Sequence, residues 1–294
     1  MEASSQRAWL AHVAVMLVLG VVAACVVALT WWNAPGASAQ EATSPEASFV
    51  VRCDFSHRNK DDPIVYPGAP GKAHSHDFFG NTSTNAYSTH ESLRAATATT
   101  CLNPDDRSAY WIPAAKWTNA KGTRTLEASR AIFYYRTNGK APEEVQPHPA
   151  GLKVVPNSHV SWMCAHGTFS TSPPTRCSNG TLAVLIRFPD CSDGNLDSAD
   201  HRSHMAYAVV QSDGTKQCPS THPTPVPALS MDIRFSIPTT SGRVKLSSGA
   251  ASTMHADFFN AWDQQKLAAL VAACINAYPF SPENPKPVEC NATG

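Results

Sequence analysis

The sequence has little charge and no long run of charge of one sign. Charged residues make up only 16% of the 294 residues, and 23 Lys and Arg residues balance 23 Asp and Glu residues. Nucleic-acid binding needs a basic face that neutralises phosphates, so this balance argues against a nucleic-acid partner. The 23 prolines are spread along the chain, which indicates a loop-rich globular protein and not a helical bundle.

Several common catalytic motifs are absent as well. The chain contains no Gly-x-Ser-x-Gly elbow, no Gly-rich phosphate-binding loop and no His-Glu-x-x-His helix. These absences argue against the α/β-hydrolase, P-loop and zinc-protease classes that depend on those motifs. No Cys-x-x-Cys pair is present either, although zinc sites built from cysteine normally use such close pairs.

Eight of the nine cysteines follow the apolar N-terminus, and an even number in an exported chain predicts a framework of up to four disulfides. The pairing of these residues is open among many combinations. Because the thiols should be oxidised, a cysteine nucleophile is not expected. The disulfide candidates are Cys53, Cys101, Cys164, Cys177, Cys191, Cys218, Cys274 and Cys290.

The N-terminus carries an export or anchor segment. Residues 8–32 contain no charged side chain, Arg7 precedes them and acidic residues follow, so the rest of the chain should cross the membrane. Three outcomes are open: cleavage after Ala39, retention of an apolar stretch of about 25 residues as an anchor, or lipidation at Cys25. Each outcome places the remaining chain outside the cytoplasm, and retention would also make the membrane a partner.

We expect residues 1–39 to form the signal peptide or anchor, residues 40–48 a flexible stalk, and residues 49–294 a single extracytoplasmic domain. Beyond Phe49 the chain shows no break in composition and no periodic repeat. Short apolar or β-branched runs bounded by Pro, Gly, Asn and Ser predict strands. The predicted strands are Phe49–Arg52, Ala109–Ile112, Ala131–Arg136, His159–Met163, Leu182–Phe188, Met205–Val210 and Met231–Ile237.

One long helix is predicted near the C-terminus, because apolar residues between Phe258 and Ile275 recur at the helical period. Pro279 and Pro282 should end it, and Cys274 and Cys290 are candidates to join its end to the following segment. Many short strands and few helices predict a β-rich α+β fold. We expect a single disulfide-stapled domain with a sandwich- or barrel-like antiparallel core that carries this helix.

Histidine is concentrated in short segments, two of which share the tripeptide Asp-Phe-Phe. The first segment contains His74, His76 and Asp77, and the second contains His255 and Asp257. If the first segment is extended, His74 and His76 project to the same side, a spacing that suits two ligands of one metal ion. The alternatives are that the imidazoles hydrogen-bond to loop backbone and that Asp257 caps the predicted helix. The shared tripeptide is too short to indicate an internal repeat.

A third polar segment follows the predicted strand at Leu182–Phe188. Residues 190–204 combine four carboxylates with two histidines, a composition that suits a cation or the hydroxyl groups of a sugar. The calcium-loop pattern is not met, because Gly194 lies between the first two acceptors and no Glu closes a twelve-residue loop. Asx turns in a disulfide-pinned loop are the structural alternative.

Several short segments occur in an order typical of one protein family. They are residues 74–81 (HSHDFFGN), 108–113 (SAYWIP), 188–191 (FPDC), 193–194 (DG), 201–207 (HRSHMAY), 218–219 (CP), 222–223 (HP) and 255–259 (HADFF). Through these segments the chain resembles the secreted bacterial and fungal proteins grouped as domain of unknown function 1996. The resemblance covers about residues 50–276 and implies one secreted domain, while the family name implies no reaction. The fungal members of this family resemble wall-associated secreted proteins.

The leading hypothesis is an extracytoplasmic cell-envelope protein that acts on cell-wall or extracellular polysaccharide. A hydrolase-like reaction would use one carboxyl group as acid and a second as base or nucleophile. We expect the candidate site residues to converge in space. They are His74, His76, Asp77, Asp190, Asp193, His201, His204, His255 and Asp257.

Two alternatives belong to other classes. A metal-binding protein would hold a divalent metal with some of His74, His76, His201, His204 and His255. A non-catalytic carbohydrate-binding or structural module would instead use exposed aromatic rings as a sugar platform. Its candidate rings are Trp111, Trp117 and Trp162.

Overall fold

The computed structural model describes residues 46–156, 159–281 and 284–292. The predicted cleavage site after Ala39 and the predicted lipidation site at Cys25 lie outside the described residues. Within those ranges, no helix is both long and apolar enough to cross a lipid bilayer. Ala47 is buried and the first strand begins at Ser48, so the folded unit takes in the end of the stretch predicted as a stalk.

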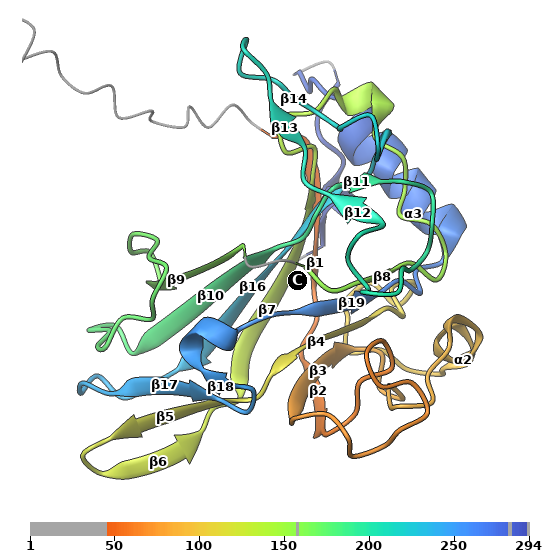
Figure 1. The fold of residues 1–294 in the computed structure, drawn as a ribbon. Helices are drawn as coiled ribbons and strands as arrows, with labels where there is room; N and C mark the ends of the chain where they lie inside the picture. The colour runs from red at the N-terminus through yellow and green to blue at the C-terminus, as the bar shows by residue number, and fades with distance from the viewer. Residues whose placement is uncertain (1–45, 157–158, 282–283, 293–294) are drawn as a thin grey trace, which may run out of the picture. The chain divides into compact units, whose positions relative to one another are not determined.

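A six-stranded sheet forms one side of the core. Its strands follow the order β20-β1-β7-β16-β10-β9 and pair antiparallel, except that β1 and β20 are parallel. Figure 1 shows β1, β7, β16, β10 and β9 side by side in one twisted sheet. The strands are β1 (Ser48–Arg52), β7 (Ala128–Arg136), β9 (Val160–Cys164), β10 (Thr181–Arg187), β16 (Ala228–Ser236) and β20 (Asn291–Ala292).

A five-stranded antiparallel sheet lies next to it, in the order β2-β3-β4-β19-β8. The central strand β4 is wholly buried, as is β3. The strands are β2 (Phe55–Asn59), β3 (His76–Gly80), β4 (Ala109–Pro113), β8 (Lys153–Val154) and β19 (Asp257–Phe259).

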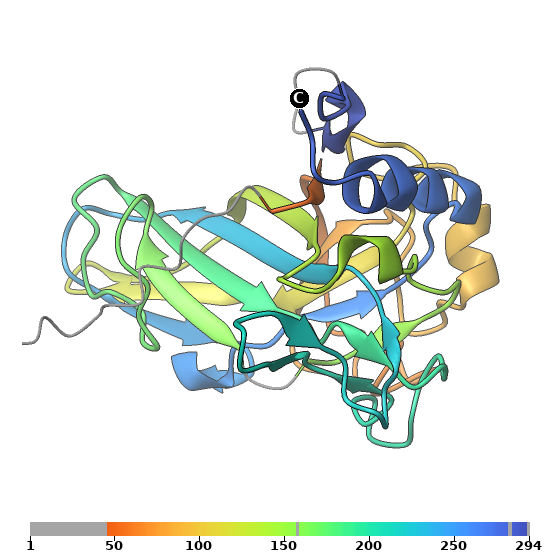
Figure 2. The same ribbon diagram turned by 90° about the horizontal axis from the view of Figure 1, so that it is seen from above.

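Three smaller sheets and a few helices complete the described fold, and Figure 2 shows them around the two main sheets. The remaining strands are β5 (Ala115–Asn119), β6 (Gly122–Thr125), β11 (Cys191–Ser192), β12 (Met205–Ala206), β13 (Val209–Val210), β14 (Lys216–Gln217), β15 (Thr224–Pro225), β17 (Arg243–Leu246) and β18 (Gly249–Ala250). The helices are α2 (His90–Ala95), α3 (Gln264–Val271), its π-helical continuation η3 (Ala272–Asn276), and the 3-10 turns η1 (Pro142–Glu144), η2 (Ala251–Thr253) and η4 (Val288–Cys290).

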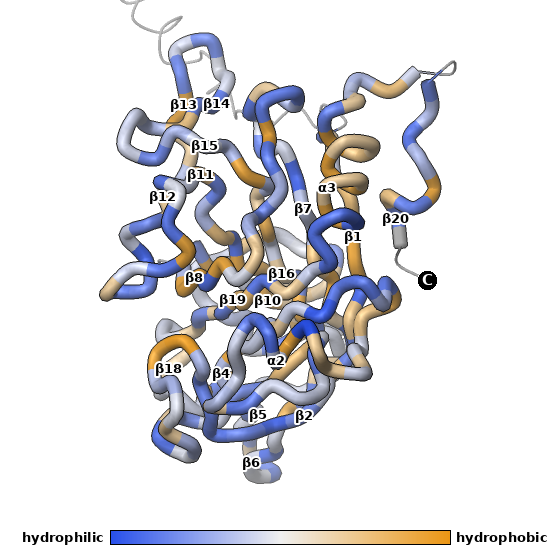
Figure 3. Tube along the Cα trace, turned by 90° about the vertical axis from the view of Figure 1, so that its right-hand side faces the viewer, coloured by the Kyte–Doolittle hydropathy of each residue, from blue (hydrophilic) through white to orange (hydrophobic). Residues whose placement is uncertain are grey.

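The two main sheets pack against each other through aromatic side chains. Phe133 of β7 lies with its ring centroid 4.1 Å from that of Tyr110 in β4 and 6.3 Å from that of Phe79 in β3. Figure 3 shows the apolar residues of this core along β1 and on α3. The described strands form open sheets and no closed barrel, so the mostly antiparallel β-rich class is confirmed and the barrel alternative is wrong.

Six of the seven predicted strands lie on β1, β4, β7, β9, β10 and β16. In β16, the alternation that predicted a strand places Met231, Ile233 and Phe235 in the core. The seventh prediction, Met205–Val210, is wrong as a single strand because it divides into β12 and β13 in different sheets. The backbone N–H of Ala208 between them donates to the Asp190 carboxylate at 2.9 Å, which interrupts strand pairing there.

The C-terminal helix begins later than its apolar pattern predicted. Asp257–Phe259 forms β19, and α3 starts only after Asp263, whose carboxylate accepts the backbone N–H of Lys266 at 3.0 Å. The prediction that Asp257 caps this helix is therefore wrong. The apolar stripe itself is confirmed from Leu267 onward, because it is buried in the core, and α3 with η3 spans 13 residues.

The prediction of four disulfides is confirmed. Cys53–Cys101, Cys164–Cys177, Cys191–Cys218 and Cys274–Cys290 close loops of 48, 13, 27 and 16 residues. The last of these joins the end of the C-terminal helix to η4, as its cysteine spacing indicated. Four such bonds are typical of a protein that works in an extracytoplasmic, oxidising compartment.

Candidate metal centre

Strand β4 lies between β3 and β19, and both of these strands begin at the same end of the sheet. Both β3 and β19 pair antiparallel with β4, so they run in the same direction. Trp111 of β4 pairs with Phe78 on one side and with Asp257 on the other, while Pro113 pairs with His76. Residues that share such rows project from the same face of a sheet. Asp257 therefore emerges beside the first residues of β3.

The period of two along an extended chain adds two histidines to this corner. His74 lies two residues before His76, and His255 lies two residues before Asp257, so each pair projects to one side. By the same register His255 occupies the row of His76 across Pro113. The two histidine segments thus correspond in space with His76 opposite His255, although their shared Asp-Phe-Phe tripeptides are offset by one residue.

The three imidazole rings lie against one another. The ring centroids of His74 and His76 are 4.2 Å apart, those of His74 and His255 are 5.1 Å apart, and those of His76 and His255 are 5.8 Å apart. One nitrogen from each ring lies within 4.8 Å of the others. The prediction that His74 and His76 project to the same side is consistent with this contact.

A second set of three groups overlaps the first through His76. A carboxylate oxygen of Asp62 and one of Asp257 lie with a His76 nitrogen inside the same 4.8 Å limit. All three residues are at most 4% exposed. We name the five residues His74, His76, His255, Asp62 and Asp257 the His/Asp cluster.

Several polar atoms of the His/Asp cluster are buried without a hydrogen-bond partner among the described residues. These are Nε2 of His74, Nε2 of His76 and Oδ2 of Asp257. Nε2 of His255 lies 3.8 Å from Oδ2 of Asp257, which is too long for a hydrogen bond. Buried polar groups are nearly always paired, so three unpaired atoms in one cluster mark it as a candidate binding site.

The other ring nitrogens define which tautomer is present. Nδ1 of His76 lies 3.0 Å from the carbonyl oxygen of Asp61, and Nδ1 of His255 lies 2.9 Å from that of Thr253. A carbonyl oxygen only accepts, so each Nδ1 must carry the proton and donate it. Each Nε2 is then left with a lone pair. Metal-bound histidines are oriented in this same way by a backbone carbonyl or carboxylate.

Burial keeps these imidazoles neutral. Burial, and then the charge of His255, lowers the pKa of His74 to about 4. Burial, and then the charge of His74, lowers the pKa of His76 to about 3. The pKa of His255 is also lowered, chiefly by burial. A neutral imidazole is the form that binds a metal ion.

The pKa values of the two carboxyl groups in the cluster are raised. Burial, and then the charge of Asp62, raises the pKa of Asp257 well above its ordinary value. Burial also raises the pKa of Asp62, although its carboxylate accepts the backbone N–H groups of Ile64 and Val65 at 3.0 and 2.8 Å. A bound cation would oppose both shifts, because it stabilises the ionised carboxylates.

Asp62 was not among the residues selected from the sequence. It lies in the loop between β2 and β3, where Asp61, Asp62 and Pro63 follow one another without strand or helix periodicity. The only local signal is an aspartate before proline that can hydrogen-bond to its own turn. Only the folded loop brings this carboxylate to His76.

Five other predicted site residues have partners outside the His/Asp cluster. Asp77 projects from the opposite face of β3 and pairs with Arg58, and the Asp190 carboxylate pairs with Lys140. Asp193 accepts from its own turn at Asn195, His201 pairs with Asp197, and His204 hydrogen-bonds to Ser198 and to the Lys153 carbonyl. The structure therefore brings together four of the nine predicted residues, namely His74, His76, His255 and Asp257.

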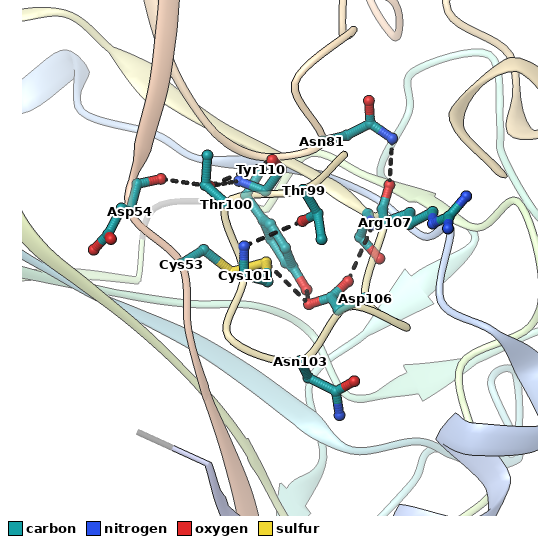
Figure 4. The surroundings of a disulfide bond; sticks show 12 residues. Cys53, Asp54, Asn81, Thr99, Thr100, Cys101, Asn103, Asp106, Arg107 and Tyr110 are labelled. Carbon is teal, nitrogen blue, oxygen red and sulfur yellow. Dashed lines mark hydrogen bonds between the residues drawn. A yellow bond between two sulfur atoms is a disulfide. The ribbon is translucent and has the colours of Figure 1, made fainter. Parts of the chain in front are cut away.

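A third group of neighbouring side chains, Asp106 with Cys53 and Cys101, does not form a set of metal ligands. Asp106 lies within 4.8 Å of the sulfurs of Cys53 and Cys101, but those sulfurs are bonded to each other and are not thiolates. Figure 4 shows this disulfide and the hydrogen bond of 2.8 Å that Tyr110 donates to Asp106. The pKa of Asp106 is raised to about 7, chiefly by burial. Its contacts are structural.

The three tryptophans considered for a sugar platform are core residues. Trp111, Trp117 and Trp162 are each at most 1% exposed. The prediction that they form a carbohydrate-binding surface is therefore wrong. Their apolar faces contribute to packing, which is the usual role of a fully buried tryptophan.

Comparison with known proteins identifies the family. Residues 62–262 match the family model described as domain of unknown function (DUF1996). This span begins at Asp62, includes the other four residues of the His/Asp cluster, and ends before α3. No curated protein and no solved structure gives a match. The matched span confirms the resemblance seen in the sequence, and the chain belongs to the family with the domain of unknown function DUF1996.

Proposed function

We propose that this domain is an extracytoplasmic metal-binding protein that holds a divalent transition-metal ion in the His/Asp cluster. The observation that carries the proposal is the convergence of three neutral imidazoles whose Nε2 atoms are free of protons or unpaired. His76 and His255 are fixed by their Nδ1–H donations to backbone carbonyls, and His74 lies against both rings.

The donor types favour zinc or a neighbouring first-row ion over calcium or magnesium. Imidazole nitrogen suits Zn²⁺, Cu²⁺, Ni²⁺ and Fe²⁺, whereas Ca²⁺ and Mg²⁺ prefer sets made of oxygen. His74, His76 and His255 would supply three nitrogens, and Asp257 would supply a carboxylate oxygen. Three histidines with one carboxylate satisfy a four-coordinate zinc site. Asp62 is the alternative carboxylate ligand, because one of its oxygens lies within 4.8 Å of ligand atoms of His76 and Asp257.

A purely structural role accounts less well for the cluster. Structural histidines and aspartates usually pair their buried polar atoms, as His204 does with both ring nitrogens. In contrast, His74 Nε2, His76 Nε2 and Asp257 Oδ2, all in the His/Asp cluster, are buried and unpaired among the described residues. Leaving a buried polar atom unpaired costs about 1–3 kcal/mol, so three such atoms in one place favour a ligand that satisfies them together.

The test is metal binding by the disulfide-bonded domain. After expression in an oxidising compartment and treatment with a chelator, isothermal titration with Zn²⁺ should show one site per chain. His74→Gln and His255→Gln should each weaken binding by more than about tenfold, because each removes a nitrogen ligand. His222→Gln is the matched control, since this histidine is outside the cluster and pairs with Thr221 and the Ser203 carbonyl.

Two results would contradict the proposal. One is the absence of any binding of Zn²⁺, Cu²⁺, Ni²⁺ or Fe²⁺ by the folded wild-type domain. The other is equal binding by wild type and by both cluster variants. Circular dichroism of each variant separates loss of the site from loss of the fold.

Action on polysaccharide stays a prediction from the sequence. Asp257 is the one member of the predicted acid and base carboxylates that lies in the cluster, next to Asp62. A metal ion bound there would supply Lewis-acid or water-activating chemistry, which many hydrolases use. The hydrolase-like activity is tested by incubating the zinc-loaded domain with cell-wall glycans and measuring released reducing ends.

A further inference from the structure

A pocket of about 510 Å³ lies beside the His/Asp cluster. Its lining comes from the loop after Asp62, from the segment at residues 86–91, from residues 150–153 and 196–197, and from Phe259 of β19. Pro63 directly follows Asp62, and Phe259 lies two residues after Asp257 on the same face of the strand. This volume is within the range of about 300–1,000 Å³ found for small-ligand sites.

An exposed aromatic ring lines this pocket. Tyr87 is 66% exposed, although a ring of this size is normally placed where its apolar face is covered. Among the described residues no other aromatic ring stacks on it. Its backbone N–H donates to Oδ1 of Asn85 at 2.8 Å, which holds the loop that presents the ring. A partner with a flat apolar face would cover Tyr87.

The polar groups of the pocket are arranged for hydroxyl groups. The Asp197 carboxylate is held by the Nδ1 of His201 at 2.8 Å and by the amino group of Lys153 at 3.5 Å. Glu91 adds a second carboxylate at the start of α2. Nδ1 of His90 donates to the Asn260 carbonyl at 3.2 Å, which leaves its Nε2 as an acceptor. Two carboxylates and one imidazole nitrogen are therefore acceptors that a sugar hydroxyl group can donate to.

The charge of the lining selects against an anionic ligand. Two carboxylates, Glu91 and Asp197, face one ammonium group, Lys153, which already pairs with Asp197. A phosphate or carboxylate would be repelled, whereas sugar hydroxyls donate to carboxylates and accept from lysine. Pro63, Pro67 and Phe259 add apolar walls for the CH groups of a ring.

We propose that this pocket binds a neutral pyranose ring of a glycan, with the ring stacked on Tyr87 and its hydroxyl groups bound by Glu91 and Asp197. The pocket is separate from the metal-binding proposal, because none of its lining residues belongs to the His/Asp cluster. A glycan bound in this pocket would lie next to the proposed metal centre, because the lining residue Pro63 follows Asp62 and the lining residue Phe259 lies two residues after Asp257.

The experiment measures binding of cellotriose, chitotriose and mannotriose to the full domain by saturation-transfer NMR and isothermal titration. At least one trisaccharide should bind, and Tyr87→Ala should weaken it by about tenfold, which is the loss expected for one stacked ring. Tyr87→Phe should keep most of the affinity because it keeps the ring. Phe169→Ala is the control, since Phe169 is 56% exposed but does not line the pocket.

The proposal is overturned if none of the three sugars binds, or if Tyr87→Ala binds as tightly as wild type. Glu91→Gln with Tyr87→Phe should lower affinity further than Tyr87→Phe alone, because the neutral amide is a weaker acceptor for hydroxyl groups. The His74→Gln variant separates the two proposals. It should weaken metal binding by more than about tenfold and keep sugar binding, so the outcome of each proposal can be measured independently of the other.

Discussion

Replacing Lys140 by methionine should destabilise the domain and leave metal binding unchanged. The Lys140 side chain is 2% exposed and its ammonium group pairs with the Asp190 carboxylate, which is fully buried. Asn138 donates to Asp190 at 3.0 Å, and the backbone N–H of Ala208 donates at 2.9 Å. These contacts join the loop after β7 to the segment between β10 and β11. The sequence made Asp190 a candidate catalytic carboxylate, and its ion pair with Lys140 indicates that it has a structural role instead.

The expected magnitude follows from the burial of both charges. Removing one partner of a buried pair costs about 3–5 kcal/mol, because the remaining charge stays buried without its counter-ion. Asp190 keeps its two hydrogen bonds in the variant, so we expect the lower part of that range, about 3 kcal/mol. For a domain of this length, the melting temperature should fall by roughly 6–12 °C.

The assay is urea unfolding of the disulfide-bonded domain, followed by circular dichroism, with Zn²⁺ titration of the same samples. The double variant Lys140→Met with Asp190→Leu should be more stable than Lys140→Met alone, because it carries no uncompensated buried charge. A change below about 1 kcal/mol in the single variant would refute the reasoning. Loss of metal binding in a fully folded variant would show that Asp190 acts at the metal centre.

Two further predictions concern the core. Because burial raises the pKa of Asp106 from 3.8 to about 7, the folded domain keeps a proton on this group that the unfolded chain releases, and the contribution of Asp106 to the free energy of unfolding should fall by roughly 3 kcal/mol as the pH rises from 4 to 7. Urea unfolding of Asp106→Asn should lack this decrease, and an unchanged pH profile would contradict it. Gly80→Ala should cost at least about 2 kcal/mol in the same assay, since Gly80 has φ of +78° and an added Cβ would lie 2.4 Å from the Ser108 carbonyl oxygen. Gly68→Ala, with φ of +71° and nothing within 4 Å, is its control and should cost less.

The strands that could be predicted from the sequence are those with a strong local pattern. Met231, Ile233 and Phe235 alternate with polar residues, and the alternation matches one buried face of β16. The short strands β3 and β19 carry no such alternation, since β3 is buried at every position. When both faces of a strand are buried, apolar residues no longer alternate with polar ones, so the sequence lacks the period-two pattern that predicts a strand.

The C-terminal helix shows where an apolar period misleads. Phe258, Phe259 and Trp262 fit the helical stripe by spacing, yet the first two belong to β19. Pairing with β4 on one side and with β8 on the other outweighs the local preference. The true start is a better local signal, because the side chain of Asp263 caps the first turn.

Part of the candidate site could be predicted from residue spacing. His74 and His76 are two residues apart, and so are His255 and Asp257, which places each pair on one side of an extended chain. Nothing local could separate these residues from His201 and His204, which have hydrogen-bond partners elsewhere. Asp62 had no periodic signal at all.

The sequence by itself determined the even set of eight cysteines, the β-rich class and the histidine pairs, and it predicted an extracytoplasmic location that the four disulfides support. Each of these depends on composition or on spacing within a few residues of the chain. Only the tertiary structure decided that the rings of His76 and His255, 179 positions apart in the chain, lie in contact, that Asp62 lies beside His76, and that Asp190 forms a buried ion pair with Lys140. The physical reason is that strand register and loop closure, which depend on the whole packed domain, determine contacts between distant segments.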